Sequence, residues 1–222
     1  METSRMIAQL KIVFQDFFDT IFGTQKVIRI GLYGPPNSGK TTLANRICKD
    51  ILNSEEDFGE VSSIAHETRK INVKERVIMA RNGKKVIFDL IDTPGIATRI
   101  DYEKFARAGM SDREAKQRAK EATRGVIESI KWLDKVDVVL MVLDSTKNPY
   151  NQVNLTIIGN LEARKIPVII AANKTDLKSS KLDRVTQSFP KYPVIGISAR
   201  FSKNMDEFYD AVLKAKKHIR KR

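Results

Sequence analysis

The spacing of hydrophobic positions from residue 27 onward changes repeatedly between strand-like and helix-like patterns. Short runs rich in β-branched residues predict strands at 27–33, 73–80, 85–91, 136–143, 168–172 and 193–197. Longer stretches of mixed character predict helices at 40–52, 102–133 (with a break near Gly109), 152–164 and 205–219. Strands that alternate with helices are typical of an α/β protein whose sheet is mostly parallel and covered on both faces.

One pair of strands interrupts this alternation. The strands at 73–80 and 85–91 are joined through Asn82-Gly83, a dipeptide that favours a two-residue hairpin turn. We therefore expect a doubly wound, mostly parallel, six-stranded sheet with one antiparallel hairpin. Sheets of this kind bind ligands at the carboxyl ends of their strands, so the loops that follow the strands carry the candidate chemistry.

The first 22 residues follow a separate pattern. Apolar residues recur at steps of three and four from Met6 to Phe22, and Gly23 follows as a stop signal, which together predict an amphipathic helix. We divide the chain into this segment, residues 1–25, and one domain at 26–222. The helix could dock on the domain, enter a groove of a partner, or associate with itself. A peripheral membrane role is less favoured, because its polar side carries few cations.

The loop after the first strand carries the clearest chemical signal. Residues 34–41 match G-x-x-x-x-G-K-[ST], the phosphate-binding loop (P-loop). The glycines allow backbone N–H groups to wrap a phosphate, Lys40 reaches the β- and γ-phosphates, and Thr41 offers its hydroxyl to Mg²⁺. The candidate phosphate-binding residues are Gly34, Pro35, Pro36, Asn37, Ser38, Gly39, Lys40, Thr41 and Thr42.

A second candidate loop follows the strand at 85–91. It reads Asp92-Thr93-Pro94-Gly95, and we call residues 92–95 the metal loop. Asp92 is placed to hold the metal ion through water, on the opposite side from Thr41, and the N–H of Gly95 is placed to contact a γ-phosphate. That contact would make the position of the metal loop depend on whether the γ-phosphate has been hydrolysed.

Base recognition is expected in the sequence Asn-Lys-Thr-Asp at 173–176, which we call the base loop. A carboxylate accepts two hydrogen bonds from the N1–H and exocyclic amine of guanine, a pair that adenine does not offer, so Asp176 predicts selectivity for guanine. Lys174 would lie over the base plane, and Asn173 would brace the loops. The pair Ser198-Ala199, after the sixth strand, is a weaker candidate for contact with the guanine oxygen.

In this order, the motifs resemble those of the GTP-binding domain of translation-factor-related small GTPases, nearest to the Era- and Der-like branch. The resemblance covers roughly residues 26–219 and implies a P-loop fold that hydrolyses GTP to GDP with Mg²⁺. It also implies a switch threonine that completes the metal shell when GTP is bound, which we place at Thr68, with Ser62 and Ser63 as alternatives. We expect no counterpart of Era's C-terminal RNA-binding domain, because the sequence ends at Arg222. On this basis the catalytic candidates are Lys40, Thr68 and Gly95, and the metal candidates are Thr41, Thr68 and Asp92.

Two positions depart from the Ras-like pattern. Ile96 stands where Ras-like relatives place a glutamine that orients the attacking water, and isoleucine has no hydrogen-bonding group. Pro36 replaces a glycine, and its ring would crowd an incoming arginine finger. We therefore expect slow intrinsic hydrolysis. A nucleotide-gated binding module that rarely hydrolyses GTP is the alternative, whereas Asp176 argues against an ATPase.

Asn37 leaves two interpretations open. In some Era-like relatives an asparagine at this place helps to hold a K⁺ ion that substitutes for the charge of the arginine finger. The other interpretation is that Asn37 only shapes the loop.

Charge extends the list of candidate partners. The chain has 40 Lys and Arg against 27 Asp and Glu, a net charge of +13, which suits the ribosome or other RNA but also simple solubility. The basic end, from Lys214 to Arg222, could contact RNA phosphates, and the mixed charges at 97–135 predict either a solvated helix face or an arm for an effector. A GTP-dependent dimer and a membrane-linked switch also stay open. The single cysteine, Cys48, favours a reducing, cytoplasmic location.

Overall fold

The computed structural model describes residues 27–52, 71–81, 83–95 and 111–215. Several features expected from the sequence lie outside these residues. They are the helix at 1–22, the switch candidates at positions 62, 63 and 68, the first part of the helix at 102–133, and the basic positions beyond 215.

The six strands form one sheet in the order β2-β3-β1-β4-β5-β6. Neighbouring strands are parallel, except that β2 runs antiparallel to β3 as the expected hairpin. The predicted mostly parallel, doubly wound sheet is therefore confirmed. The bounds of the six strands are β1 Ile28–Tyr33, β2 Asn72–Arg81, β3 Lys84–Asp92, β4 Val138–Asp144, β5 Val168–Asn173 and β6 Val194–Gly196.

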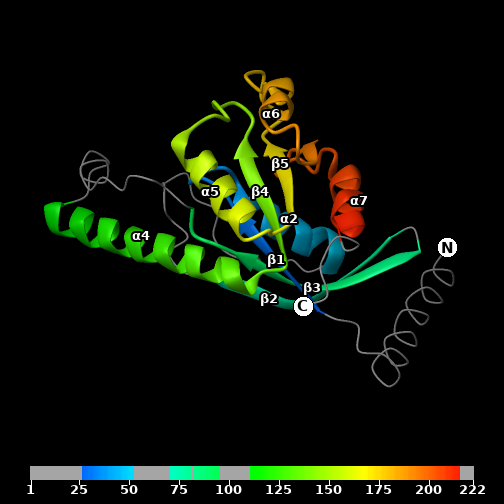
Figure 1. Cartoon of the computed structure of the whole chain (residues 1–222), viewed down its shortest axis with the longest axis horizontal. Helices are drawn as coiled ribbons and strands as arrows, with labels where there is room; N and C mark the ends of the chain where they lie inside the picture. The colour runs from blue at the N-terminus through cyan, green and yellow to red at the C-terminus, as the bar shows by residue number, and fades with distance from the viewer. Residues whose placement is uncertain (1–26, 53–70, 82, 96–110, 216–222) are drawn as a thin grey trace.

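Helices cover both faces of this sheet (Figure 1). Buried residues of α2 and α7 pack on one face, and those of η1, α5 and α6 pack on the other, together with the end of α4. The bounds are α2 Lys40–Leu52, α4 Asp112–Trp132, α5 Gln152–Ala163, α6 Leu182–Ser188 and α7 Met205–Ala215, with a 3₁₀ turn, η1, at Leu133–Lys135. Among the described residues, no helix is both long enough and apolar enough to cross a membrane.

The central strand β4 shows how the sequence builds two cores at once. Its side chains alternate between the two faces of the sheet, and all of them except Asp144 are buried. A nearly continuous apolar run is what a strand covered on both faces requires. Val138, Leu140 and Val142 face α2 and α7, whereas Val139, Met141 and Leu143 face α5.

Two differences from the predicted elements have local causes. The described helix α4 begins at Asp112, because Ser111 is an extended N-cap residue whose side chain forms a capping box with Glu114. Helix α6 was not predicted. It has only seven residues, and its N-cap, Lys181, makes no side-chain capping bond, so no clear signal marks its start.

Candidate nucleotide-binding site

The strand register brings the candidate loops to one edge of the sheet. Leu32, near the end of β1, is paired with Asp92, and Asp144, at the end of β4, is paired with Asn173. Because these strands are parallel, the P-loop, the metal loop and the base loop all start at this edge. Segments far apart in sequence are thus neighbours in space.

The P-loop has a backbone that its two glycines alone permit. Gly34 has a φ of 152°, and a Cβ atom there would collide with the carbonyl oxygen of Val142. Gly39 has a φ of 96°, and a Cβ atom there would collide with the side-chain amide of Asn173. Glycine is therefore required at both positions, by the dihedral angles of this loop and by its close packing against β4 and β5.

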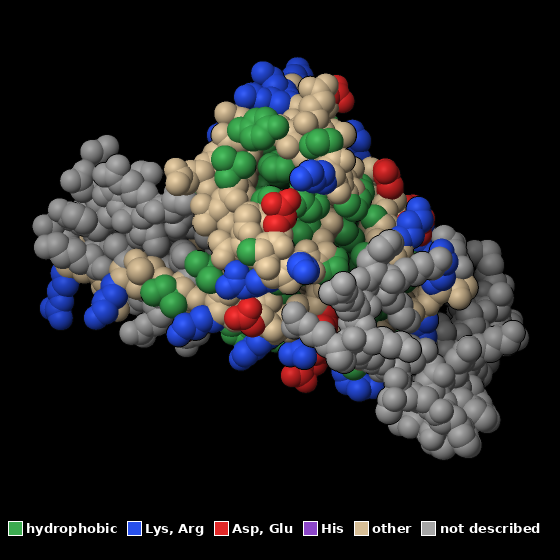
Figure 2. Space-filling view, viewed as in Figure 1, with side chains coloured by type: hydrophobic (Ala, Val, Ile, Leu, Met, Phe, Trp, Pro, Cys, Tyr) green, Lys and Arg blue, Asp and Glu red, His purple; other side chains and the backbone are tan. Residues whose placement is uncertain are grey.

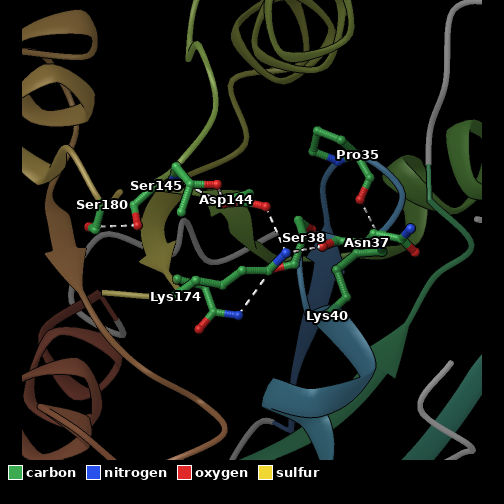
Figure 3. A network of polar contacts seen from close by, with 10 residues as sticks. Pro35, Asn37, Ser38, Lys40, Asp144, Ser145, Lys174 and Ser180 are labelled. Carbon is green, nitrogen blue, oxygen red and sulfur yellow. Dashed lines mark hydrogen bonds and ion pairs between the residues drawn. The ribbon is translucent and has the colours of Figure 1, made fainter. Parts of the chain in front are cut away.

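Lys40 is folded against the loop that precedes it. Its Nζ donates a hydrogen bond to the carbonyl oxygen of Pro35 at 2.9 Å (Figure 3). It also donates to the carbonyl oxygen of Gly34 at 3.3 Å. Burial lowers the pKa of Lys40 to about 8, although the charge of Asp92 partly offsets this effect. A buried ammonium group that is hydrogen-bonded to two backbone carbonyls, and whose charged form burial disfavours, is suited to pair with an added anion.

The metal candidates Thr41 and Asp92 lie in direct contact. The hydroxyl of Thr41 donates to Oδ2 of Asp92 at 2.7 Å, whereas the sequence predicts that the two residues lie on opposite sides of an ion. Burial raises the pKa of Asp92, more than the Thr41 hydroxyl and Lys40 lower it. Its Oδ1 is buried with no hydrogen-bond partner among the described residues, and the same holds for Oγ of Ser38. A hydroxyl beside an unsatisfied carboxylate oxygen is a donor set that fits Mg²⁺.

Asn173 joins the P-loop to the loop that follows β6. Its Nδ2 donates to the carbonyl oxygen of Ser38 at 3.0 Å, and its Oδ1 accepts the N–H of Ala199 at 3.0 Å. The sequence predicts that Asn173 braces the loops, and these two hydrogen bonds join the P-loop to the loop after β6. Within the pair Ser198-Ala199, the weaker candidate for contact with the guanine oxygen, the N–H of Ala199 donates to Asn173.

Lys174 connects the base loop to a residue that the sequence analysis missed, Asp144. Figure 3 shows its side chain reaching between Asp144 and the P-loop. Its Nζ donates to Oδ2 of Asp144 at 2.6 Å and to the carbonyl oxygen of Asn37 at 2.7 Å. Burial raises the pKa of Asp144, but hydrogen bonds from Lys174 and Thr146 outweigh it and bring the pKa below its usual value. The signal was available, since Asp144 follows a buried apolar strand just as Asp92 does.

A second brace comes from Arg46 on α2. Its guanidinium donates to the carbonyl oxygens of Ala199, at 3.1 Å, and Arg200, at 3.3 Å, and so ties the loop after β6 to the helix that follows the P-loop. No local pattern distinguishes Arg46 from other helix cations.

Asp176 is exposed at the end of the base loop, where an incoming base could reach its carboxylate.

Gly95 brings the metal loop against the P-loop. A Cβ atom on Gly95 would lie 2.7 Å from the Cα atom of Pro36, so the two loops are in contact at this point. The P-loop thus contacts both the metal loop and the base loop, while Thr68 lies outside the described residues.

This arrangement agrees with what the sequence matches among known families. Residues 29–174 match the model of a family described as 50S ribosome-binding GTPase. The chain belongs to this GTPase family. It is 28% identical over 202 residues to GTPase Der of Campylobacter hominis and 31% identical over 208 residues to GTPase Der of Thermosipho africanus. Each match covers 88% of this chain but only 38% and 41% of the respective relative, so the chain spans less than half of either protein.

Solved structures show the same fold. An Aquifex aeolicus Era variant bound to GDP·AlF4⁻ has a TM-score of 0.64 at 23% identity, and covers 86% of this chain and 57% of its own. Era in complex with MgGDPNP and a segment of 16S ribosomal RNA also has a TM-score of 0.64, at 22% identity, over 85% of this chain and 56% of its own. The predicted resemblance to Era- and Der-like GTPases is confirmed.

The burial of Lys40 leads to a direct test of the site's electrostatics. In protein free of nucleotide and metal, we expect the Lys40 ammonium to titrate at about pH 8 instead of near 10.5. The folded state then loses this proton before the unfolded state does, so the group adds stability as pH rises between these two values. NMR titration of lysine side chains measures the pKa, and the signal that Lys40→Arg removes identifies it. Titration of that signal near 10.5 would contradict the described burial.

Proposed function

We propose that this domain is a Mg²⁺-dependent molecular switch that binds GTP and hydrolyses it slowly to GDP and phosphate. The observation that carries the proposal is the bridge made by Asn173. It fixes the base loop to the P-loop through the carbonyl of Ser38, at 3.0 Å. A ligand that fills both loops needs a base at one end and a polyphosphate at the other, which describes a nucleoside triphosphate.

Each phosphate-side residue then has a distinct role. Lys40 neutralises charge on the β- and γ-phosphates, and its bonds to the P-loop carbonyls are exchanged for phosphate oxygens. Thr41 supplies a hydroxyl and Asp92 a carboxylate to the region of the metal, where Mg²⁺ would balance the charge that develops on the phosphates. Thr68 is proposed to complete the metal shell, and the N–H of Gly95 to contact the γ-phosphate.

Guanine selectivity is proposed to rest on Asp176. In Asp176→Asn the carboxylate becomes an amide that donates a hydrogen bond, so one partner of the guanine N1–H and amine is lost. We expect the affinity for GDP to fall about a hundredfold and the affinity for xanthosine diphosphate to rise. Fluorescent-nucleotide titration of both forms measures this. Asp183→Asn, an exposed carboxylate on α6, is the control that should leave both affinities unchanged. Equal loss for both bases would refute the assignment.

Hydrolysis is proposed to be slow because Ile96 offers no group to orient water, and Asn37 is the candidate to recruit K⁺. Asn37 has a φ of 59°, a backbone state that suits asparagine and glycine, so loop shaping and ion binding both remain consistent with it. Replacement by glycine separates them, because Asn37→Gly keeps the backbone state and removes the amide.

We expect single-turnover hydrolysis below about 10⁻² s⁻¹ in Na⁺ and an increase of about tenfold or more in K⁺. In Asn37→Gly the K⁺ increase should disappear while GDP affinity stays within about twofold. Phosphate release with matched Na⁺ and K⁺ salts measures both rates. Equal rates in the two salts would assign Asn37 to loop shaping alone.

An RNA partner, of the ribosome or otherwise, is proposed from charge and from the relatives. One Era structure includes a segment of 16S ribosomal RNA, and the matching family is described as ribosome-binding. In this chain, Lys and Arg side chains line the lower margin of α4 (Figure 2). Arg113, Lys120 and Lys131 on that helix are exposed, and their spacing of seven and eleven residues places them on one face over about 27 Å.

Replacing these three cations by glutamine should weaken binding to ribosomes and reduce its salt dependence, because each phosphate contact releases a counterion. Co-sedimentation at 50 to 200 mM salt measures this, with anionic vesicles as a separate arm. The charge-matched control changes three other exposed cations, Lys147, Arg184 and Lys191. Equal weakening by both sets would show a response to net charge alone, and pelleting with vesicles alone would favour the membrane-linked alternative.

A further inference from the structure

A buried serine on α4 connects this helix to the metal loop and to the end of β1. Ser129 lies in the last turns of α4 and is fully buried. Its hydroxyl donates to the carbonyl oxygen of Pro94, in the metal loop, at 3.3 Å. Its own carbonyl oxygen accepts the hydroxyl of Tyr33, the residue just before the P-loop, at 2.9 Å. One residue of α4 thus touches the metal loop and the end of β1 together.

The ring of Tyr33 occupies space that is left by the missing side chain of Gly31. A Cβ atom on Gly31 would lie 2.6 Å from the Tyr33 ring, so a glycine inside the central sheet creates the space for the ring. Glycine weakens a strand, and its use here marks a required close approach. Burial also raises the pKa of Tyr33, which keeps its hydroxyl protonated as the donor to Ser129.

The bond to Pro94 has a geometric consequence for Gly95. The carbonyl of Pro94 and the N–H of Gly95 belong to one planar peptide unit, and the described residues contain no cis peptide bond. In a trans unit the two groups point in opposite directions. A carbonyl held toward α4 by Ser129 therefore turns the Gly95 N–H away from α4. Thr93, the residue before Pro94, is itself fixed to β1, because its hydroxyl donates to the carbonyl of Leu32 at 2.6 Å.

We propose that Ser129 is a positioning residue that orients the Gly95 N–H toward a γ-phosphate, while Tyr33 holds Ser129 in place. This inference rests on the proposed binding of GTP. A separation of 3.3 Å is long for a hydroxyl donor, so the bond has room to shorten when the metal loop closes on a triphosphate. Because GDP has no γ-phosphate, Ser129 acts on the affinity for GTP and not on that for GDP. Helix α4 senses the nucleotide by the same contact.

The test compares two nucleotides in the full chain with Mg²⁺. Ser129→Ala removes the hydroxyl and keeps the carbonyl that Tyr33 contacts. We expect the affinity for a non-hydrolysable GTP analogue to fall about three- to tenfold, with the GDP affinity unchanged within about twofold. Tyr33→Phe, which removes a single hydroxyl, should give a smaller loss in the same direction. It serves as the main variant if Ser129→Ala is not folded.

A matched control is present in the chain. The hydroxyl of Tyr150 also donates to a serine carbonyl, that of Ser188, at 3.2 Å, but outside the site. Tyr150→Phe should leave the ratio of GTP-analogue to GDP affinity unchanged. In the Ser129→Ala, Tyr33→Phe double variant the loss should not exceed that of Ser129→Ala alone, because both groups act on the same peptide.

Each outcome decides a different question. Equal losses for both nucleotides, or no loss for either, would overturn the positioning role and leave the proposed GTP binding intact. Failure of the unmodified chain to bind the GTP analogue would overturn the proposed function itself. A loss confined to the GTP analogue, absent in Tyr150→Phe, is the result that supports the proposal.

Discussion

The site depends on the side-chain amide of Asn173, because this one group hydrogen-bonds both the P-loop and the loop after β6. An amide can do this since it donates and accepts at once, and both of its contacts are with backbone atoms. Gly39 is part of the same arrangement, because any side chain there would occupy the position of the amide. The P-loop, the base loop and the loop after β6 are therefore fixed relative to one another.

Two charged side chains of the site are also buried. Lys40 and Asp92 are both buried, and burial shifts the pKa of each toward its neutral form. A site of this kind holds its charges at a cost that an anionic phosphate and a divalent cation would relieve. The buried oxygens of Asp92 and Ser38 that lack a hydrogen-bond partner among the described residues fit the same role, because each such atom in a native protein needs an explanation.

Sequence patterns were sufficient for the elements and loops whose signals are local. The P-loop glycines, the apolar run of β4 and the Asn82-Gly83 hairpin each encode their structure within a few residues. Contacts between distant segments were less accessible. Arg46 and Ser129 look like ordinary helix residues until the fold places them against carbonyls 153 and 35 positions away. Asp144 lies between these cases, since its position after a buried strand is a local signal but its contact with Lys174 depends on the fold.

The length of helix α4 beyond its contact with the metal loop has a mechanical consequence. It is held near one end, at Ser129, and its capped beginning at Ser111 lies 18 residues earlier, which is about 27 Å along a rigid rod. A tilt of about 10° at the held end would carry the capped end through about 5 Å. If the contact at Ser129 follows the metal loop as proposed, a helix of this length would magnify a small rotation beside the metal loop into a larger displacement of its capped end.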